Sequence, residues 1–398
     1  MTPFEEALQA VVQSAVAINA FEEVPLAQAG DRIVSTPIHS PINVPGFDNS
    51  AMDGYAVVAA HVVSGKNYVV SSRIPAGAGL NTLEPETVAR IFTGAPMPRG
   101  ADAVIMQENA TPQGERVSFT ERPSVGQHVR SAGDDIATGK LLVDHGAVLG
   151  AADIGMLASV GFASVSCFRK PVVGLLSTGD ELVQPGEPLG AGQIYNSNRF
   201  FLARLLECCG AEVRDLGACP DSLAETRAKV EVAAQDIDCL VTTGGMSVGE
   251  EDHIRALIDD IGSMQFSRVA MKPGKPVAFG ELCDTHFFGL PGNPVSAFAT
   301  FYLLVRPWLL KTAGRERYLP TRRRCRITAD TVNKGSRTDF RRVSVTQSDA
   351  AELCVEPHAK QGSGVLSAVA ESNAFLPLQP TESLQCGDLC EVILIEGV

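Results

Sequence analysis

The sequence predicts a multi-domain protein in which an α/β unit with a parallel-rich sheet is joined to β-rich units. Its 398 residues exceed the roughly 250–300 at which single cores stop growing, so two to four domains are expected. Residues 171–310 alternate strand-like and helix-like runs, which is typical of a parallel sheet covered by helices. Residues 37–140 and the stretch after Trp308 instead carry short β-like runs separated by Gly, Pro and Asn.

The first element is a predicted helix that begins at Thr2 and Pro3. Thr2 can cap it, Pro3 suits its first position, and Glu5 completes a capping box. The strand-like runs of the β-rich stretches are Tyr68–Val70, Ala103–Met106, Arg116–Thr120, Arg341–Thr346, Leu353–Glu356 and Leu389–Ile395.

The α/β stretch contains four predicted strands and four predicted helices. The strands are Val172–Leu176, Glu212–Leu216, Cys239–Thr243 and Phe287–Leu290. The helices are Arg199–Cys209, a run from a capping box at Ser222 to about Gln235, Asp252–Ile261, and a long helix that Asn293 caps and Pro294 begins.

Composition excludes several classes of protein. A net charge of −13 argues against nucleic-acid binding, which needs a basic surface. No apolar run reaches the roughly 20 residues of a membrane span, so no membrane association is expected. The N-terminus lacks the basic start and apolar run of a secretory signal, and the cysteines show no zinc spacing. We therefore expect a cytoplasmic protein with free thiols.

Polar residues follow the first predicted α/β strand. They are Ser177, Thr178, Gly179, Asp180 and Glu181. In parallel sheets, ligands collect at the carboxyl ends of strands, and small residues let backbone N–H groups approach an anion. The alternative is a capped turn with exposed acids.

A glycine-rich segment follows strand Cys239–Thr243. It is the stretch Thr242–Asp252, and its candidate ligand-binding residues are Thr243, Gly244, Gly245, Ser247 and Gly249. Adjacent glycines and hydroxyl side chains suit a loop that wraps a phosphate. A simple turn is the alternative, but two such loops in one domain favour a phosphate-binding site.

Carboxylates and cations suggest two further features. Glu181, Asp221 and Asp252 follow strand ends and can form an oxygen-only Mg²⁺ site. Lys272 and Lys275 flank a Pro-Gly turn that can aim both ammonium groups at one oxyanion. Each acid can instead favour a helix N-terminus, and the lysines can belong to a solvated turn.

Seven motifs in one order resemble the molybdopterin molybdenumtransferase family, the MoeA and gephyrin E-domain group. They are PGFDNSAMDGYA, TGAP, GDDI, STGDEL, GGMSVGEED, KPGKP and GLPGNPVSA, which together span essentially the whole chain. The resemblance implies four parts: an N-terminal helix with a small, discontinuous α+β linking domain (1–39 and 140–170), a β-rich inserted domain (40–139), a three-layer α/β molybdopterin-binding-like domain (171–318), and a C-terminal β-barrel-like domain (319–398).

The resemblance also implies a function. The family converts adenylylated molybdopterin and molybdate into molybdenum cofactor with release of AMP, assisted by Mg²⁺. Its members work as homodimers in which the inserted domain of one subunit reaches the site of the other, and an adenylyltransferase is the expected upstream partner. The pterin supplies the sulfur ligands of molybdenum, so cysteine ligands are not needed.

Residue roles transfer motif by motif. Glu181, Asp221 and Asp252 resemble the Mg²⁺ and phosphoanhydride residues, and Glu181 or Asp252 is the candidate that directs water. The molybdate-pocket residues are Lys272, Lys275, Arg342 and Ser363, with Arg341 left open as the alternative to Arg342. Asp53, Thr93 and Asp135 match functional positions of the inserted domain, and Pro291 and Pro294 shape the loop before the long helix.

Two other functions remain open from the sequence. Molybdopterin adenylyltransferases share the α/β fold, but Gly244-Gly245-Met246-Ser247 lacks their GGTG-type ending. A gephyrin-like scaffold is the non-enzymatic alternative, although the chain carries no separate interaction tail.

Overall fold

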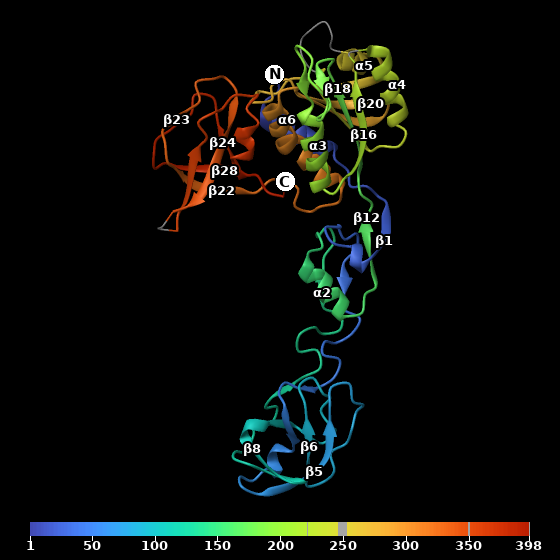
Figure 1. Ribbon diagram of the computed structural model, residues 1–398, viewed down its shortest axis with the longest axis vertical. Coiled ribbons are helices and arrows are strands. Elements are labelled where there is room, and N and C mark those ends of the chain that lie inside the picture. Colours follow the sequence, from blue (N-terminus) through green and yellow to red (C-terminus); the bar gives the residue numbers. More distant parts are fainter. Residues whose placement is uncertain (221, 246–252, 349–350, 398) are drawn as a thin grey trace.

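The computed structural model is an elongated molecule of several bodies. It describes residues 1–220, 222–245, 253–348 and 351–397. Figure 1 shows a β-rich body at one end, a small linking body in the middle, and an α/β body beside a second β body at the other end. No helix in these described ranges is long and apolar enough to cross a membrane.

A six-stranded sheet forms the centre of the α/β body. Its order is β16 (Glu212–Cys219), β13 (Val172–Thr178), β17 (Cys239–Thr243), β21 (Thr285–Leu290), β20 (Ala278–Leu282) and β18 (Gly262–Phe266). The first four strands are parallel, as the sequence predicts, while β20 and β18 pair antiparallel. Strand β18 was not predicted, because Gly262–Phe266 contains only two large apolar residues.

The parallel strands end at one edge of the sheet. Ser177 lies beside Thr243, and Thr243 lies beside Leu290 on the next strand. The segments that follow β13, β17 and β21 therefore meet at this edge, which is where the sequence placed the candidate site.

Helices cover both faces of the sheet, so the central strands β13, β17 and β21 are buried at every position except Val172 and His286. The helices are α3 (Ser197–Cys208), α4 (Leu223–Ala233), α5 (His253–Ile261), α6 (Pro294–Thr300), a π-helical turn η4 (Phe301–Val305) and α7 (Arg306–Thr312), joined by α1 (Phe4–Ser14). The largest apolar cluster runs from α1 through the sheet and α6 to α7, and it continues into the C-terminal body through Phe340 and Phe375.

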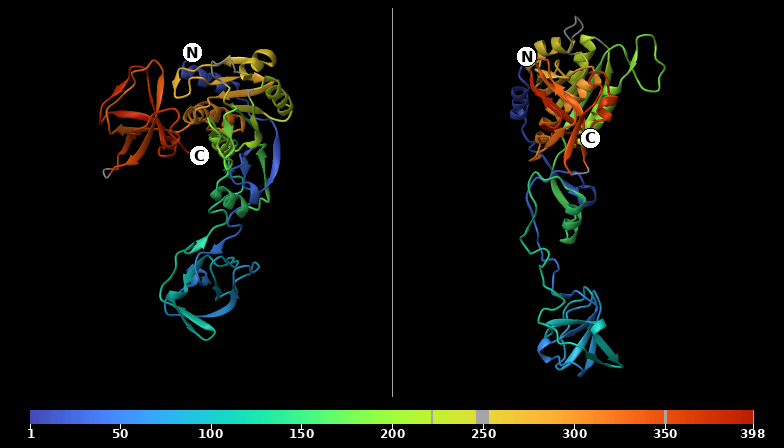
Figure 2. Two further views of the ribbon diagram at one scale, coloured as in Figure 1. Left: turned by 45° about the horizontal axis from the view of Figure 1, so that its top comes forward. Right: turned by 90° about the vertical axis from the view of Figure 1, so that its left-hand side faces the viewer.

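The linking body is built from two distant segments of the chain. Strand β1 (Phe21–Pro25) pairs with β12 (Ser164–Phe168), and β2 (Ile38–His39) pairs with β11 (Leu141–Val143). Helix α2 (Ala151–Ser159) packs on them around a separate apolar core. The two views in Figure 2 show the inserted body hanging from this narrow connection.

The inserted body contains one curled sheet. Its order is β7 (Ala103–Met106), β4 (Gly54–Val57), β6 (Thr87–Ile91), β5 (Asn67–Ile74), β9 (Arg116–Phe119) and β8 (Ala110–Gln113), and a short pair joins β3 (Asn49–Ser50) to β10 (Val129–Arg130). All three strand-like runs predicted here are confirmed. Apolar clusters fill both faces of the sheet.

The C-terminal body is a closed five-stranded barrel, as the sequence predicts. Its strands are β24 (Thr338–Gln347), β25 (Leu353–Pro357), β22 (Arg322–Ile327), β28 (Leu389–Leu394) and β26 (Ala374–Leu378), and β26 closes the barrel against β24. Strand β19 (Met271–Lys272) of the α/β body adds to β24, and α8 (Ser367–Ala370) lies between β25 and β26.

Helix starts agree with the sequence only in part. Ser222 caps α4 by accepting a hydrogen bond from the Glu225 N–H, as predicted. The predicted Thr2 cap of the first helix is wrong. Helix α1 begins at Phe4 without a side-chain cap, because the Thr2 backbone instead bonds to Arg268 and Ala270 across an isolated bridge to Val269. Asn293 occupies the N-cap position of α6, as predicted, but its side chain makes no capping bond.

Helix α3 allows a matched test of which residues hold the α/β core. Leu202 is fully buried, whereas Phe200, two positions earlier, is 55% exposed. Leu202→Ala should lower the free energy of unfolding of this body by about 2–5 kcal/mol, because it removes buried methyl groups and leaves a cavity. Phe200→Ala should change it by less than about 0.5 kcal/mol. Denaturant unfolding followed by tryptophan fluorescence measures both, and equal effects would contradict the core assignment.

Candidate active site

The first two strand-end loops touch each other through a glycine. A Cβ atom on Gly244 would lie 2.3 Å from the Thr178 carbonyl oxygen, and Gly244 has a φ of +94°. Gly245 follows with a φ of +64°. Only glycine combines this close approach with a positive φ at low cost. The pair of glycines noticed in the sequence therefore has a definite structural reason.

Oxygen atoms without partners gather at the same edge. The buried hydroxyls of Ser177, Thr178 and Thr242 have no hydrogen-bond partner among the described residues. Glu181 is exposed beyond them, and its carboxylate folds back over Gly179, which has a φ of +141°. Asp180 is exposed beside it. Buried polar atoms are nearly always paired, so this group suits a site that receives a polar ligand.

The turn before α6 is the third segment at this edge. Pro291 is buried. A Cβ atom built on Gly292 would lie 4.0 Å from the Gly244 Cα. The Gly244 N–H donates to the Leu290 carbonyl at 3.2 Å, which joins the ends of β17 and β21. Pro294 begins α6, as predicted.

Four predicted site residues lie outside the described residues. They are Asp221, Ser247, Gly249 and Asp252. Within the described ranges no group of three or more His, Cys, Asp or Glu side chains could hold a metal ion. Of the three predicted Mg²⁺ ligands, the structure therefore places only Glu181.

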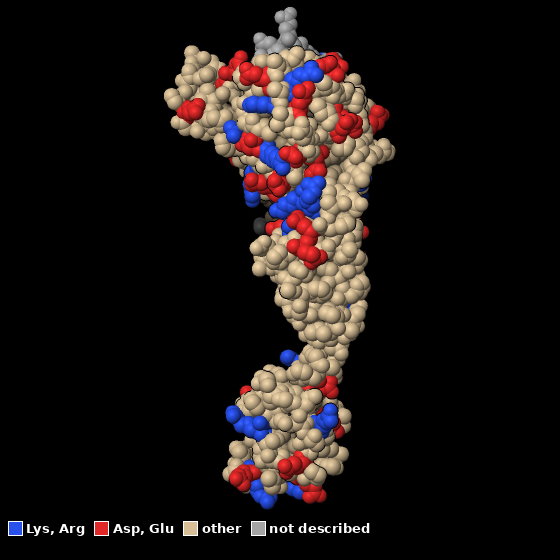
Figure 3. Space-filling model, turned by 90° about the vertical axis from the view of Figure 1, so that its right-hand side faces the viewer, with Lys and Arg blue, Asp and Glu red and all other residues tan. Residues whose placement is uncertain are grey.

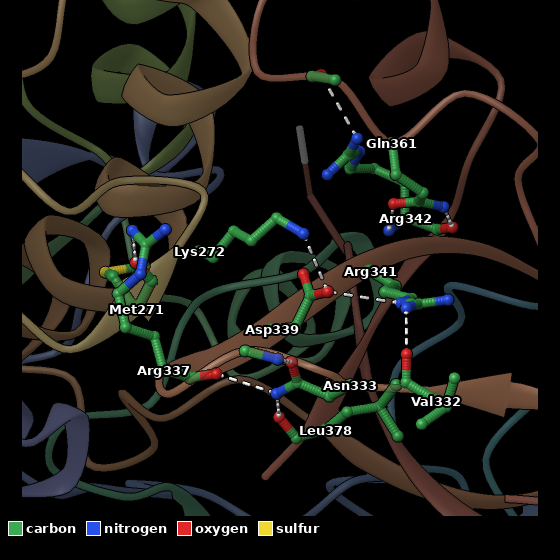
Figure 4. A network of polar contacts seen from close by, with 12 residues as sticks. Met271, Lys272, Val332, Asn333, Arg337, Asp339, Arg341, Arg342, Gln361 and Leu378 are labelled. Atoms are coloured by element: carbon green, nitrogen blue, oxygen red, sulfur yellow. Dashed lines mark hydrogen bonds and ion pairs between the residues drawn. The ribbon is translucent and has the colours of Figure 1, made fainter. Parts of the chain in front are cut away.

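A network of charges lies where the α/β body meets the barrel. Lys272 Nζ lies 3.3 Å from Asp339 Oδ2, and Arg341 Nε lies 3.4 Å from the same oxygen. Figure 4 shows both cations pointing to this one buried carboxylate, which sits opposite Lys272 in the β19–β24 register. One carboxylate is thus shared by two cations, so the network keeps a net positive charge.

Arg342 points to the other face of β24. It is 1% exposed, and its Nη2 donates weakly to the carbonyls of Lys360 and Gly362 at 3.4 and 3.3 Å. Burial lowers the pKa of Arg342 from its usual value, and the nearby carboxylate of Asp339 opposes this. The Gln361 side chain pairs with the Arg342 backbone in both directions (Figure 4).

The chain that follows Gly362, one of the contacts of Arg342, reaches the α/β body. The Ser363 carbonyl accepts a hydrogen bond from the Val295 N–H at 3.1 Å, so the predicted Ser363 lies against the start of α6. Lys275 is exposed, and its side chain makes no hydrogen bond or ion pair within the described parts of the chain. The Pro-Gly turn between the lysines packs tightly, since a Cβ on Gly274 would lie 2.4 Å from Thr300.

The structure joins two of the predicted residues of the inserted body. Asp53 Oδ1 accepts hydrogen bonds from the backbone N–H and the hydroxyl of Thr93, at 2.9 and 3.0 Å. These bonds lower the pKa of Asp53, chiefly through the backbone donor. Asp135 is exposed on a neighbouring segment and is not bonded to either residue. The inserted body, which carries this group, lies at the opposite end of the molecule from the α/β body, which carries Glu181 (Figure 1).

Asn198 is a site residue that sequence reasoning missed. Its side chain is 7% exposed and bonds to both Thr243 and Gly292. The only sequence signal is an asparagine just inside a helix start, where such residues are usually read as caps. Its neighbour Asn196 is the residue that caps α3.

Comparison with known proteins decides the family. Profiles of the MoeA N-terminal region (domain I and II), of a probable molybdopterin binding domain and of the MoeA C-terminal region (domain IV) match residues 2–161, 174–311 and 324–395. A curated Haemophilus influenzae protein named molybdopterin molybdenumtransferase is 42% identical over 90% of this chain and 89% of its own length. The chain belongs to the MoeA family.

Other MoeA relatives agree along the whole chain. A Bacillus subtilis molybdopterin molybdenumtransferase is 33% identical over 94% of this chain and 90% of its own length. A crystal structure described as a molybdopterin biosynthesis MoeA protein from Pyrococcus horikosii superposes with a TM-score of 0.86 at 33% identity, covering both chains completely. Gephyrin of Dictyostelium discoideum is 33% identical over 79% of this chain, which spans 50% of that longer protein.

The glycines of the site allow a paired substitution. Gly244→Ala should destabilise the α/β body by about 1–3 kcal/mol, because the methyl group meets the Thr178 carbonyl at a positive φ. Gly292→Ala should cost much less, since the nearest atom to its Cβ lies 4.0 Å away and its φ is not positive. Thermal unfolding of the two variants checks this. A Gly292→Ala loss as large as that of Gly244→Ala would contradict the close approach.

The bond between Asp53 and Thr93 predicts a measurable titration. Thr93→Val keeps the backbone donor but removes the hydroxyl, so the pKa of Asp53 should rise part of the way toward its ordinary value of about 3.9. Because the folded pKa is lowered, the stabilisation is present above the ordinary pKa and is lost as the pH falls through the folded pKa. Carboxyl ¹³C NMR titration measures this, with Thr87→Val as the control on β6. An unchanged Asp53 pKa in Thr93→Val would count against the hydroxyl bond.

Proposed function

We propose that this protein inserts molybdenum during molybdenum cofactor biosynthesis, converting adenylylated molybdopterin and molybdate into molybdenum cofactor and AMP. The observation that carries the proposal is the full-length similarity to molybdopterin molybdenumtransferases, at 42% identity over 90% of this chain. The geometry supports it, because glycine-rich strand-end loops suited to phosphate lie in the same body as the Lys272 turn, which is suited to an oxyanion.

The strand-end loops are proposed to hold the phosphate-bearing half of the substrate. The backbone at Gly244 and Gly245 carries no side chain of its own, so a phosphate can approach its N–H groups, and the hydroxyls of Ser177 and Thr178 can add polar contacts. The turn at Pro291 and Pro294 closes this cradle on the side of α6. Gly249 and Ser247 belong to the same proposal from the sequence.

Molybdate is proposed to bind at the junction with the barrel. Lys272 and Arg341 reach the same space over Asp339 and keep an excess of positive charge there, and Lys275 follows three residues after Lys272. Arg342 is buried and bonded to main-chain carbonyls, which fits a residue that shapes the segment leading to Ser363. The geometry therefore favours Arg341 as the arginine that touches the oxyanion.

Mg²⁺ is proposed to act at the phosphoanhydride. The exposed Glu181 follows Ser177 and Thr178 in the chain, and the buried hydroxyls of these two have no hydrogen-bond partner within the described ranges; together they offer the kind of oxygen donors that this cation prefers. Asp221 and Asp252 complete the proposed ligands. When bound, the cation would neutralise charge on the phosphates as AMP departs. Glu181, held over Gly179, is placed to orient water at the same end.

We further propose that the working unit is a homodimer with sites shared between subunits. Asp53, Thr93 and Asp135 belong to the inserted body, which lies at the opposite end of the chain from the α/β body that carries Glu181, so they can act there only from a second copy. Exposed apolar side chains accompany both groups: Phe47 and Met52 flank Asp53, while Ile194 and Tyr195 pair with the strand after Glu181. Burying both sets against one another would stabilise such an arrangement.

The surface charge agrees with a small-molecule enzyme. On the face in Figure 3, basic and acidic side chains are interspersed over the α/β and inserted bodies, and the middle of the molecule carries few of either. No broad basic surface for a nucleic acid is seen on this face. A cytoplasmic place of action and an adenylyltransferase as the upstream partner belong to the same proposal, because the substrate arrives adenylylated.

A direct assay tests the reaction. Purified protein given adenylylated molybdopterin, molybdate and Mg²⁺ should release AMP and yield cofactor that activates an apo-molybdoenzyme. Glu181→Gln should slow AMP release about a hundredfold or more, whereas Glu187→Gln, on the same exposed loop, should not. Absence of molybdate-stimulated AMP release by the wild-type protein would sink the proposal, and product formation from ATP and molybdopterin would indicate an adenylyltransferase instead.

Subunit mixing tests the shared site. Asp53→Asn and Glu181→Gln should each be inactive alone. Mixed dimers contain one site with both natural residues, so a random mixture should recover up to about a quarter of wild-type activity. Two differently tagged copies confirm that subunits have exchanged. If tagged heterodimers form and no activity returns, both residues act within one chain and the shared-site proposal is wrong.

A further inference from the structure

Asn198 joins three segments that are far apart in the sequence. It is the second residue of α3, and its Nδ2 donates to Thr243 Oγ1 at the end of β17 and to the Gly292 carbonyl before α6, both at 2.8 Å. The carbonyl of Gly292 can only accept, so the bonded atom must be the amide nitrogen. The orientation of this side chain is therefore fixed by its partners.

The Thr243 hydroxyl extends the connection by one more bond. It accepts from Asn198, which leaves its own proton for the Pro291 carbonyl at 3.4 Å. One amide and one hydroxyl thus hold two consecutive carbonyls of the turn before α6. A serine at 198 would be too short to reach both partners, and an apolar residue could bond to neither.

The bonds of Asn198 lie next to the close approach between the first two strand-end loops. Gly244 follows Thr243 directly, and its Cβ position is 2.3 Å from the Thr178 carbonyl. The start of α3 is also tied to the Glu181 segment, because the Ile194 N–H donates to the Glu181 carbonyl at 2.9 Å and the Asn196 N–H donates to Val183. A small shift of α3 would therefore move all three loops.

We propose that Asn198 is a positioning residue that sets the spacing of the Gly244 loop and the Pro291–Asn293 turn around the phosphate-bearing substrate, an inference that rests on the proposed function. In this scheme both bonds of the Asn198 amide nitrogen go to the protein, so Asn198 positions the loops rather than binding the substrate itself. It acts through Thr243 and Gly292. Its loss therefore weakens substrate binding more than it weakens the fold.

The primary test compares Asn198→Ala with a matched control. Tyr302→Phe also removes two bonds between distant segments, since the Tyr302 hydroxyl donates to the Leu394 carbonyl and accepts from the Glu396 N–H, away from the strand ends. Asn198→Ala should raise the KM for adenylylated molybdopterin about tenfold or more with a smaller change in kcat. Tyr302→Phe should lower the Tm similarly and leave the KM unchanged.

A double-variant cycle shows whether Asn198 acts through Thr243. Thr243→Val removes the hydroxyl that accepts the Asn198 bond. It therefore breaks the same bond and provides a second test if Asn198→Ala does not fold. The double variant should lose little more than the worse single variant, because both remove one connection. A crystal structure of the folded variant should show the Pro291–Asn293 turn displaced from Gly244.

Three results would overturn this role. They are a KM for Asn198→Ala within about twofold of wild type, a rise in KM no greater than that of Tyr302→Phe at equal Tm, or fully additive losses in the double variant. Failure of the proposed function is distinguishable, because it would abolish AMP release by the wild-type protein rather than change the ranking of the variants.

Discussion

The close approach of Gly244 to the Thr178 carbonyl is the constraint on which the rest of the site depends. Strands β13 and β17 end side by side, and any side chain at 244 would hold them apart. At the same strand ends, the hydroxyls of Ser177, Thr178 and Thr242 are buried and have no hydrogen-bond partner in the part of the chain that the structure describes. Here the backbone is tightly packed, but side-chain hydroxyls lack hydrogen bonds. Such a region is suited to receive a polar ligand rather than to stabilise the fold.

The barrel contributes to the site because one apolar core holds it against the α/β body. Phe4 packs edge-on against Phe340 of β24, with ring centroids 4.7 Å apart, and Phe375 packs with Phe298 and Tyr302. This core fixes β19 beside β24 and so brings Lys272 opposite Asp339. The alternation of β24 then sends Arg341 to that carboxylate and Arg342 to the other face. Two adjacent residues therefore have different surroundings because side chains alternate between the two sides of a strand.

Much of the fold could be predicted because the α/β body follows strong local rules. Cys239–Thr243 forms a strand with the predicted bounds, and Ser222 caps its helix as its spacing with Glu225 indicates. The missed strands have local reasons. Arg322–Ile327 contains four arginines, since only Cys325 and Ile327 face the barrel core, and Gly262–Phe266 borders the sheet edge. Thr2 failed as a cap because its backbone bonds to the distant segment 268–270 in place of the local bond.

The sequence by itself determined the family, the order of the bodies and the two loops proposed to hold phosphate, because these depend on motifs and periodicities carried by neighbouring residues. Only the tertiary structure shows that Arg341 contacts Asp339 while Arg342 is buried, that Asn198 joins Thr243 to Gly292, and that the inserted body lies at the opposite end of the molecule from the α/β body. Those features depend on register, burial and contacts between segments up to hundreds of residues apart. No local pattern encodes such contacts, since the same residue types are equally suited to turns, caps and solvated surfaces.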